Sequence, residues 1–146
     1  MTALPAAIDG LVALLATSPG LGLSGVRVDD GPWLERPSEP DVVVIGWLPT
    51  EGPTVAWVAQ TADMRTDRES FDIAGLASAW DGGTVMKTVR DRADSLIEAI
   101  RAALRTDPTL GGVVSRARLN TVSAAQFQNG DGCEFTVNFT VSAVVF

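Results

Sequence analysis

The chain has 146 residues, a length that suits one domain, and its 18 acidic and 11 basic side chains give a formal charge of −7. It contains one cysteine and no histidine, so it lacks the commonest general base and metal ligand and has no internal disulfide. The acidic balance argues against tight electrostatic binding to nucleic acid or to an anionic membrane, because both need clustered cations. Composition therefore excludes a disulfide-framed secreted scaffold and most histidine-dependent chemistry.

The first segment predicts an amphipathic helix over Leu4–Leu15. Its apolar residues recur at intervals of three and four and form one stripe: Leu4, Ile8, Leu11, Val12 and Leu15. The apolar start of the chain has no basic region and contains Asp9, so we do not expect a signal peptide. No apolar run in the sequence approaches the roughly 20 residues that span a bilayer, and we expect a protein made and assembled in a cytoplasm.

The segment from 26 to 79 predicts strands separated by turns. Val26–Asp29 is a short strand candidate, and the unbroken β-branched run Val42–Ile45 predicts a central strand covered on both faces. Residues 48–68 form a long loop or an extended hairpin, in which Val55–Thr61 is a possible strand. Glu69–Ala79 alternates between apolar and polar side chains, as expected of a half-buried strand.

A second and longer helix is predicted over Val85–Arg105, which carries one apolar stripe opposed by charged residues. Thr84 is the expected N-cap, and Pro108 forces the helix to stop. Gly82 and Gly83 precede this helix, but no phosphate-loop lysine pattern accompanies them. We interpret them as a turn and cap.

The C-terminal third predicts a β-hairpin of the strands Val113–Phe127 and Cys133–Phe146. The Asn-Gly-Asp-Gly sequence at 129–132 between them is the strongest turn signal in the chain. The first strand changes parity, which predicts a β-bulge near Thr121. The order of elements predicts a single α+β domain spanning 1–146, with an antiparallel or mixed sheet of about four to five strands and two helices packed on one face.

Acidic side chains gather at the end of the long loop and in the strand that follows it: Asp63, Asp67, Glu69 and Asp72. Such carboxylates are candidates for acid–base catalysis or metal binding, but they match no fixed motif such as an EF-hand loop. A solvated loop is the simpler interpretation. Cys133 beside the hairpin turn has no histidine to activate it and is interpreted as a partly buried structural thiol. We therefore expect no catalytic, metal-binding or cofactor-binding residues.

Tryptophans and mixed charges mark the long loop as a candidate contact surface. Trp47 and Trp57 flank the loop, and tryptophan is enriched both at interface hot spots and in ordinary cores. Arg65 and Arg68 lie among carboxylates, a pattern that fits either an intersubunit ion-pair set or a solvated surface. The candidate subunit or partner interface comprises Trp47, Trp57, Met64, Arg65, Arg68 and Glu69.

Short sequence phrases spread over nearly the full length carry a resemblance to one family. They are Val26–Pro32, the apolar strand that ends at Gly46, Trp57, Arg68–Ile73, Asp81-Gly82-Gly83 before the second helix, Asp107–Gly112 after it, and the alternating aromatic strand of the final hairpin. In these phrases and in its order of elements the chain resembles the tail terminators of long-tailed, siphovirus-like bacteriophages, particularly those that infect actinobacteria.

The resemblance implies a structural virion protein that is not an enzyme and needs no cofactor. Tail terminators form a homo-oligomer, expected here to be a hexameric ring, that caps the completed tail tube. The implied partners are the major tail tube protein and the head–tail connector or stopper protein, and genomic DNA passes through the lumen without specific binding. The location implied is the head-proximal end of the virion tail, and the host cytoplasm during assembly. The alternatives are another phage neck or tail-completion protein and, from a different class, a small carboxylate-dependent hydrolase.

Overall fold

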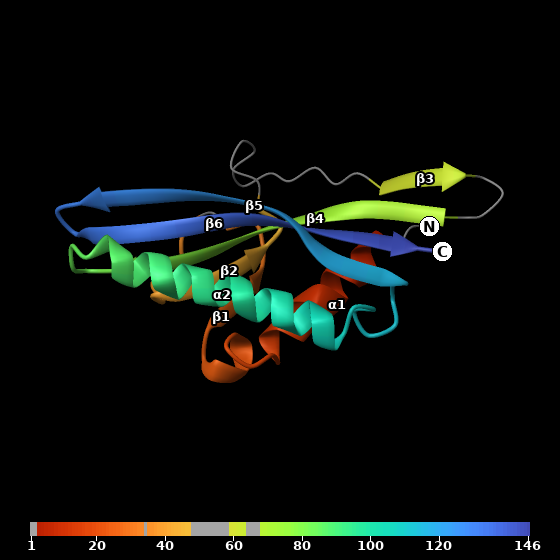
Figure 1. The fold of residues 1–146 in the computed structure, drawn as a ribbon, viewed down its shortest axis with the longest axis horizontal. Coiled ribbons are helices and arrows are strands. Elements are labelled where there is room, and N and C mark those ends of the chain that lie inside the picture. Colours follow the sequence, from red (N-terminus) through yellow and green to blue (C-terminus); the bar gives the residue numbers. More distant parts are fainter. Residues whose placement is uncertain (1–2, 34, 48–58, 64–67) are drawn as a thin grey trace.

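The computed structural model describes residues 3–33, 35–47, 59–63 and 68–146. Within these residues, two helices lie on one side of a six-stranded mixed sheet (Figure 1), which confirms the predicted α+β class with more strands than the expected four to five. The helices and strands are α1 (Leu4–Ala16), the short 3-10 helix η1 (Gly22–Ser24), β1 (Arg27–Asp30), β2 (Asp41–Ile45), β3 (Ala59–Asp63), β4 (Arg68–Asp81), α2 (Met86–Thr106), β5 (Arg116–Asn129) and β6 (Gly132–Val145).

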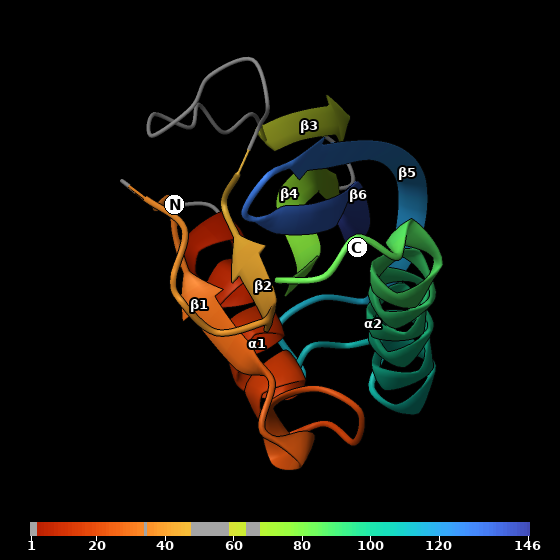
Figure 2. The same ribbon diagram turned by 90° about the vertical axis from the view of Figure 1, so that its left-hand side faces the viewer.

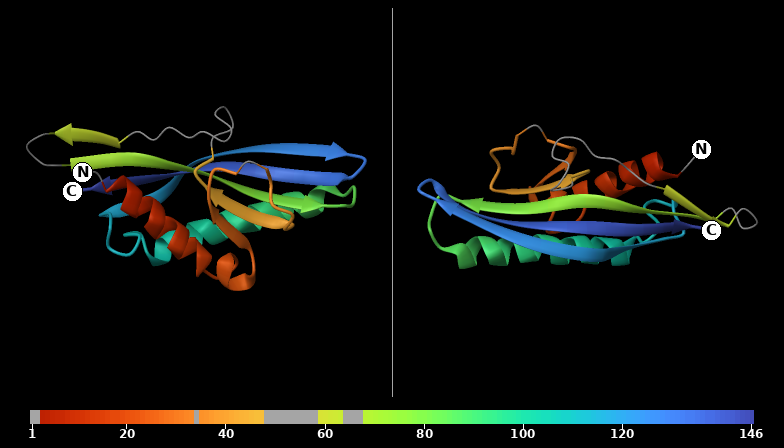
Figure 3. Two further views of the ribbon diagram at one scale, coloured as in Figure 1. Left: turned by 180° about the vertical axis from the view of Figure 1, so that it is seen from behind. Right: turned by 90° about the horizontal axis from the view of Figure 1, so that it is seen from above.

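Strand β4 is at the centre of the sheet. The strands lie in the order β1-β2-β4-β6-β5, and β3 pairs with the N-terminal part of β4. β1 and β2 are parallel, whereas the other described pairs are antiparallel. The possible strand at 55–61 corresponds in part to β3, and its residues 55–58 lie outside the described part of the chain. Figure 3 shows β4, β5 and β6 as the long strands that run the length of the molecule.

Both helices form where the apolar stripes predict them, and each turns its stripe to the sheet. The buried residues of α1 are Ala7, Leu11 and Leu15, and Pro5 lies in its first turn, where a missing N–H costs nothing. The buried residues of α2 follow the same spacing: Val89, Ala93, Leu96, Ile97, Ile100, Ala103 and Leu104. None of the described helices is long and apolar enough to cross a membrane.

The expected cap of α2 is wrong. The N-cap is Val85, and no side chain caps the helix there. The turn before α2 is held instead by Asp81, whose Oδ1 accepts a hydrogen bond from the Gly83 amide at 3.2 Å. Thr84 therefore lies one residue too early to bond the free amides of the first helical turn.

The hairpin is confirmed, with β5 ending at Asn129 and β6 starting at Gly132. The register shifts between Leu119 and Thr121, where the parity change predicted a bulge. On β6 the alternating apolar residues from Phe135 to Val145 are buried or packed against the core, and Phe139 is only 2% exposed. The Phe139 ring occupies the space above Gly75 of β4, where a Cβ would overlap it. A side chain at position 75 would therefore force the Phe139 ring or the neighbouring backbone to shift.

Strand β2 is covered on both faces, as its unbroken apolar run predicts. Val42, Val43, Val44 and Ile45 are all 0% exposed. Val43 and Ile45 belong to the core beneath the sheet. On the other face, Gly31 of the β1–β2 connection lies against the Val44 side chain, and Arg36 of the same connection bonds Ser78 of the neighbouring β4. The connection thus crosses the sheet on the side opposite the helices.

Candidate functional site

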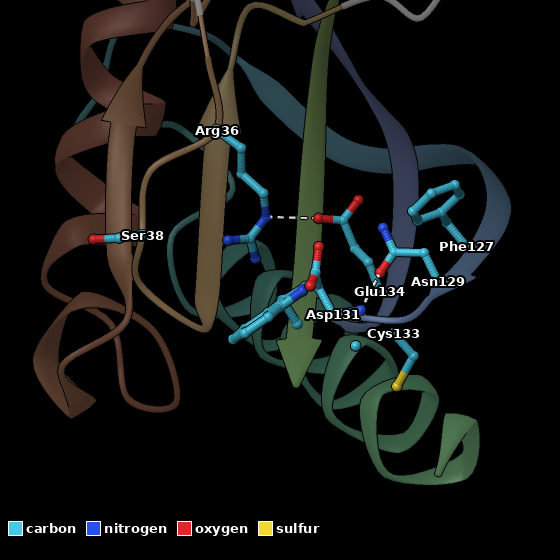
Figure 4. Close-up of a pocket in the computed structure, with 9 residues that line it drawn as sticks. Arg36, Ser38, Phe127, Asn129, Asp131, Cys133 and Glu134 are labelled. Carbon is cyan, nitrogen blue, oxygen red and sulfur yellow. Dashed lines mark hydrogen bonds and ion pairs between the residues drawn. The ribbon is translucent and has the colours of Figure 1, made fainter. Parts of the chain in front are cut away.

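A pocket of about 510 Å³ opens at the hairpin end of the sheet, on the outer face, meaning the face opposite the two helices. Three strands and the β1–β2 connection contribute its lining residues: Arg36, Ser38, Trp80, Phe127, Asn129, Asp131, Gly132, Cys133 and Glu134. Figure 4 shows Arg36 and Glu134 pointing toward each other in this pocket. A pocket of this size lies within the range of ligand-sized cavities.

Strand register explains why these side chains meet. Trp80 of β4 is paired with Glu134 of β6, and Glu134 is paired in turn with Phe127 of β5. Residues paired across antiparallel strands point to the same face, so the three side chains form a row with the carboxylate between two aromatic rings. Trp80 is 39% exposed and Phe127 is 61% exposed. The row therefore presents apolar surface to solvent beside a charged group.

Arg36 makes most of the polar contacts in the pocket. Its Nε lies 2.7 Å from Glu134 Oε2 and donates a 3.2 Å hydrogen bond to Ser78 Oγ. Its other nitrogens donate to three backbone carbonyls of the β1–β2 connection: Pro37 and Glu39, both at 2.9 Å, and Pro40 at 3.1 Å. Burial lowers the pKa of the Arg36 guanidinium from its usual value, and the Glu134 carboxylate opposes that shift. Arg36 thus fastens the connection to the outer face.

Trp47, one of the predicted interface residues, follows β2 and lies beside Trp33, near the start of the β1–β2 connection. Its ring is tilted by 46° against that of Trp33, with centroids 6.2 Å apart. The Trp33 indole Nε1 donates a 2.7 Å hydrogen bond to Asp29 Oδ2. Trp47 is therefore partly buried against the connection.

Glu69 is the other predicted interface residue whose side chain is described. Its Oε1 accepts a 2.9 Å hydrogen bond from the Ala3 amide, just before α1. The structure does not bring Glu69 and Trp47 together, because the Gly46 amide bonds to the Ala74 carbonyl and Glu69 lies about 16 Å further along β4. Arg68 begins β4, and Trp57, Met64 and Arg65 lie outside the described residues.

The acidic residues of β4 do not form a carboxylate pair. Glu69 and Asp72 are three positions apart on one strand, so they project from opposite faces of the sheet. Asp72 Oδ1 accepts a 2.7 Å hydrogen bond from Ser142 Oγ on the outer face. Asp63 lies on β3, and Asp67 is outside the described residues. No group of three potential metal ligands occurs in the described part of the chain.

The sequence predictions missed the pocket at the hairpin end. Part of the row could have been predicted from the sequence. A two-residue turn after Asn129 pairs Asn129 with Gly132, and counting back two positions pairs Phe127 with Glu134. Arg36 carried no such signal, since it lies in an irregular proline-rich connection. Cys133 was expected to be partly buried and is 1% exposed; it borders the pocket, but its thiol belongs to the core on the helix side of the sheet (Figure 4).

Comparison with known proteins shows a similarity of fold to a solved structure. No protein-family model matches the chain, and no curated protein matches it by sequence. Among solved structures, a chain in the virion of a native gene transfer agent (GTA) particle has a similar fold, with a TM-score of 0.51 and 13% identity. The similarity covers 94% of this chain and 92% of that chain. At this level of identity, the chain shares its fold with a virion component.

Proposed function

We propose that the protein is a structural component of a phage-like virion and acts as a tail terminator, a ring that caps the completed tail tube and joins it to the head connector. The observation that carries this proposal is the fold similarity to a chain of a virion particle, which extends over 94% of this chain. The resemblance in sequence phrases and element order to tail terminators supports the more specific role. The row formed by Trp80, Glu134 and Phe127 offers the kind of contact surface that an assembly protein needs.

The size and charge of the chain suit such a ring. A domain of 146 residues has a radius of gyration of about 15 Å, too small to surround a DNA duplex alone. A channel for DNA therefore needs several copies, joined by contacts between two different patches on each copy. Proteins bind DNA tightly when their cations displace the counterions around its phosphates. A chain with a net charge of −7 does not favour this exchange, so DNA passes through the ring without adhering.

The proposed interface includes the long loop, with Trp47, Trp57, Met64, Arg65, Arg68 and Glu69 as its candidate residues. Trp57→Ala tests it. We expect the monomer to fold normally, with an unchanged unfolding transition, and the assembled fraction to fall. Leu23→Ala is the matched control, because Leu23 is 69% exposed and lies in η1, outside the proposed interface. If Trp57→Ala lowers folding stability and assembly equally, Trp57 belongs to the core.

The function itself is tested by native mass spectrometry and analytical ultracentrifugation, with and without purified tail tubes. We expect a ring, or a monomer that forms rings on tubes. A chain that remains a monomer and never associates with tubes would refute the proposal.

Another neck or tail-completion protein is the second candidate, because the solved structure that shares the fold is described by its particle and not by a position in a tail. Incubating the protein separately with purified heads and with purified tails distinguishes the two roles. A terminator associates with tails in the absence of heads, whereas a head-completion protein associates first with heads.

A further inference from the structure

Four arginines line a second hollow, of about 360 Å³, between the C-terminal end of α2 and the start of β5. They form the arginine surface: Arg101, Arg105, Arg116 and Arg118. The other lining residues are Leu104, Pro108, Ala117 and Leu119, so no carboxylate contributes to the hollow. Arg101 pairs with the exposed Glu98, whereas the other three arginines have no ion-pair partner among the described residues.

The arginines reach this hollow from both sides of the edge strand β5. Arg101 and Arg105 are four residues apart on α2, whereas Arg116 and Arg118 are two residues apart on β5 and share the outer face, because Arg118 is paired with Ser142. Like charges at such spacing repel each other, and the negative end of the α2 dipole offsets only part of that repulsion. From residue 99 to residue 130 the net charge is +3, in a chain of −7. An anionic surface that covers such a cluster is therefore bound favourably, because it relieves this repulsion.

The opposite edge of the sheet carries the complementary charge. From residue 27 to residue 41 there are five acidic side chains and two arginines, a net charge of −3. Arg27 is paired within this segment with Asp29 and Glu39. Asp30 and Glu35 are exposed and have no ion-pair partner in the described part of the chain. This acidic edge comprises Asp29, Asp30, Glu35 and Glu39.

The two charged surfaces flank the sheet. β1 and β5 are the first and last strands in the order β1-β2-β4-β6-β5, four strand spacings or about 19 Å apart. Figure 2 shows β1 on one side of the molecule and β5, with α2 beside it, on the other. A ring needs this arrangement, because each copy must present two different patches that face away from each other.

We infer that the arginine surface of one copy binds the acidic edge of the next copy, and that this contact closes the ring. The inference rests on the proposed ring-forming function and adds the surfaces that carry it. A two-fold dimer through the arginine surface would place like charges against each other, which disfavours that arrangement. DNA phosphates are a second anion that the arginines could meet, but binding DNA would leave the acidic edge without a partner.

Charge reversal of each surface tests the inference. One variant is Arg116→Glu with Arg118→Glu, and the other is Asp30→Arg with Glu35→Arg. The control is Lys87→Glu with Arg90→Glu, because both residues are exposed on the N-terminal half of α2, away from the two surfaces. We expect each reversal to weaken self-association by at least about tenfold, as close interfacial charge pairs do, and the control to assemble like the unmodified chain. Mixing the two reversal variants should restore a ring of alternating copies, because each contact then again joins an acidic surface to a basic one, and one chain carrying all four reversals should assemble alone for the same reason.

Native mass spectrometry at low and high salt reads out assembly, circular dichroism reads out folding, and a fluorescent DNA duplex reads out DNA binding. Recovery of assembly in the four-reversal chain shows that the single-surface variants lost a contact and not their fold. If the unmodified chain never forms rings, with or without tail tubes, the proposed function fails. If it forms rings and both reversal variants assemble like the control, the function stands and this inference is overturned. Intact rings with lost DNA binding in the arginine variant would also overturn it and assign the surface to nucleic acid.

Discussion

Replacing Arg36 by methionine tests whether one side chain fastens the β1–β2 connection to the outer face. The Arg36 side chain is 25% exposed and that of Glu134 is 24% exposed, so their ion pair is intermediate between surface and buried pairs. Exposed pairs contribute about 0.2–1 kcal/mol, and removing one partner of a buried pair costs about 3–5 kcal/mol. Arg36→Met also removes the donor to Ser78 and to three carbonyls. We expect the free energy of unfolding to fall by about 2 kcal/mol.

A double-mutant cycle separates the pair from the rest of the network. Arg36→Met leaves the Glu134 carboxylate unpaired between two aromatic rings, whereas Arg36→Met combined with Glu134→Met leaves no unpaired charge. The double variant should therefore be more stable than the sum of the two single losses predicts. Urea unfolding followed by tryptophan fluorescence provides the free energies, with native mass spectrometry confirming one assembly state for all variants. An Arg36→Met change within about 0.5 kcal/mol of the parent, or strict additivity, would refute the reasoning.

Three further predictions concern packing, the helix stripe and pH. Gly75→Ala should lower the free energy of unfolding by about 1–3 kcal/mol, because the new Cβ would overlap the Phe139 ring and lie 2.9 Å from the Val44 carbonyl oxygen; Gly130→Ala, with open space around it, is the control. Ile97→Asp should abolish cooperative folding by placing a charge in the core, and a soluble variant with a cooperative thermal transition would contradict the helix assignment. Hydrogen bonds from Thr109 and Gly111 lower the pKa of Asp107, so its contribution to stability is present at neutral pH and is lost as the pH falls through that lowered pKa. Asp107→Asn should therefore lose less stability than the unmodified chain as the pH falls, when the free energy of unfolding is measured across a pH series. The same loss at low pH in both proteins would contradict this prediction.

The sequence predicted the elements whose signals are local. The helices follow from apolar stripes with buried residues such as Leu11 and Ile100, and the hairpin follows from the turn at 129–132. The sheet order did not follow, because the parallel pairing of β1 with β2 and the central place of β4 depend on contacts between distant segments. The Thr84 cap failed because Asp81 holds the turn instead.

The candidate site was less accessible to sequence reasoning than the fold. The long loop was favoured because it combined tryptophans with charges, yet Trp47 packs against Trp33 in the described structure. The opposed placement of the charged surfaces on β5 and beside β1 could not be predicted, because the two segments that carry them are far apart in the sequence. Arg116 and Arg118 alternate with apolar residues on a strand, a spacing that marks one face, but only the sheet order places them opposite Asp30.

Strand β4 divides the sheet into regions that can open separately. Along one side it pairs with β6 from Glu69 to Asp81, whereas along the other it pairs with β3 near Phe71 and then with β2 from Gly75 onward. We therefore expect amide hydrogens in the β3–β4 pairing to exchange with solvent through a local opening that leaves the β2–β4 pairing intact. Exchange in the β2 pairing requires the covered centre of the sheet to separate, so the two ends of one strand have different opening free energies.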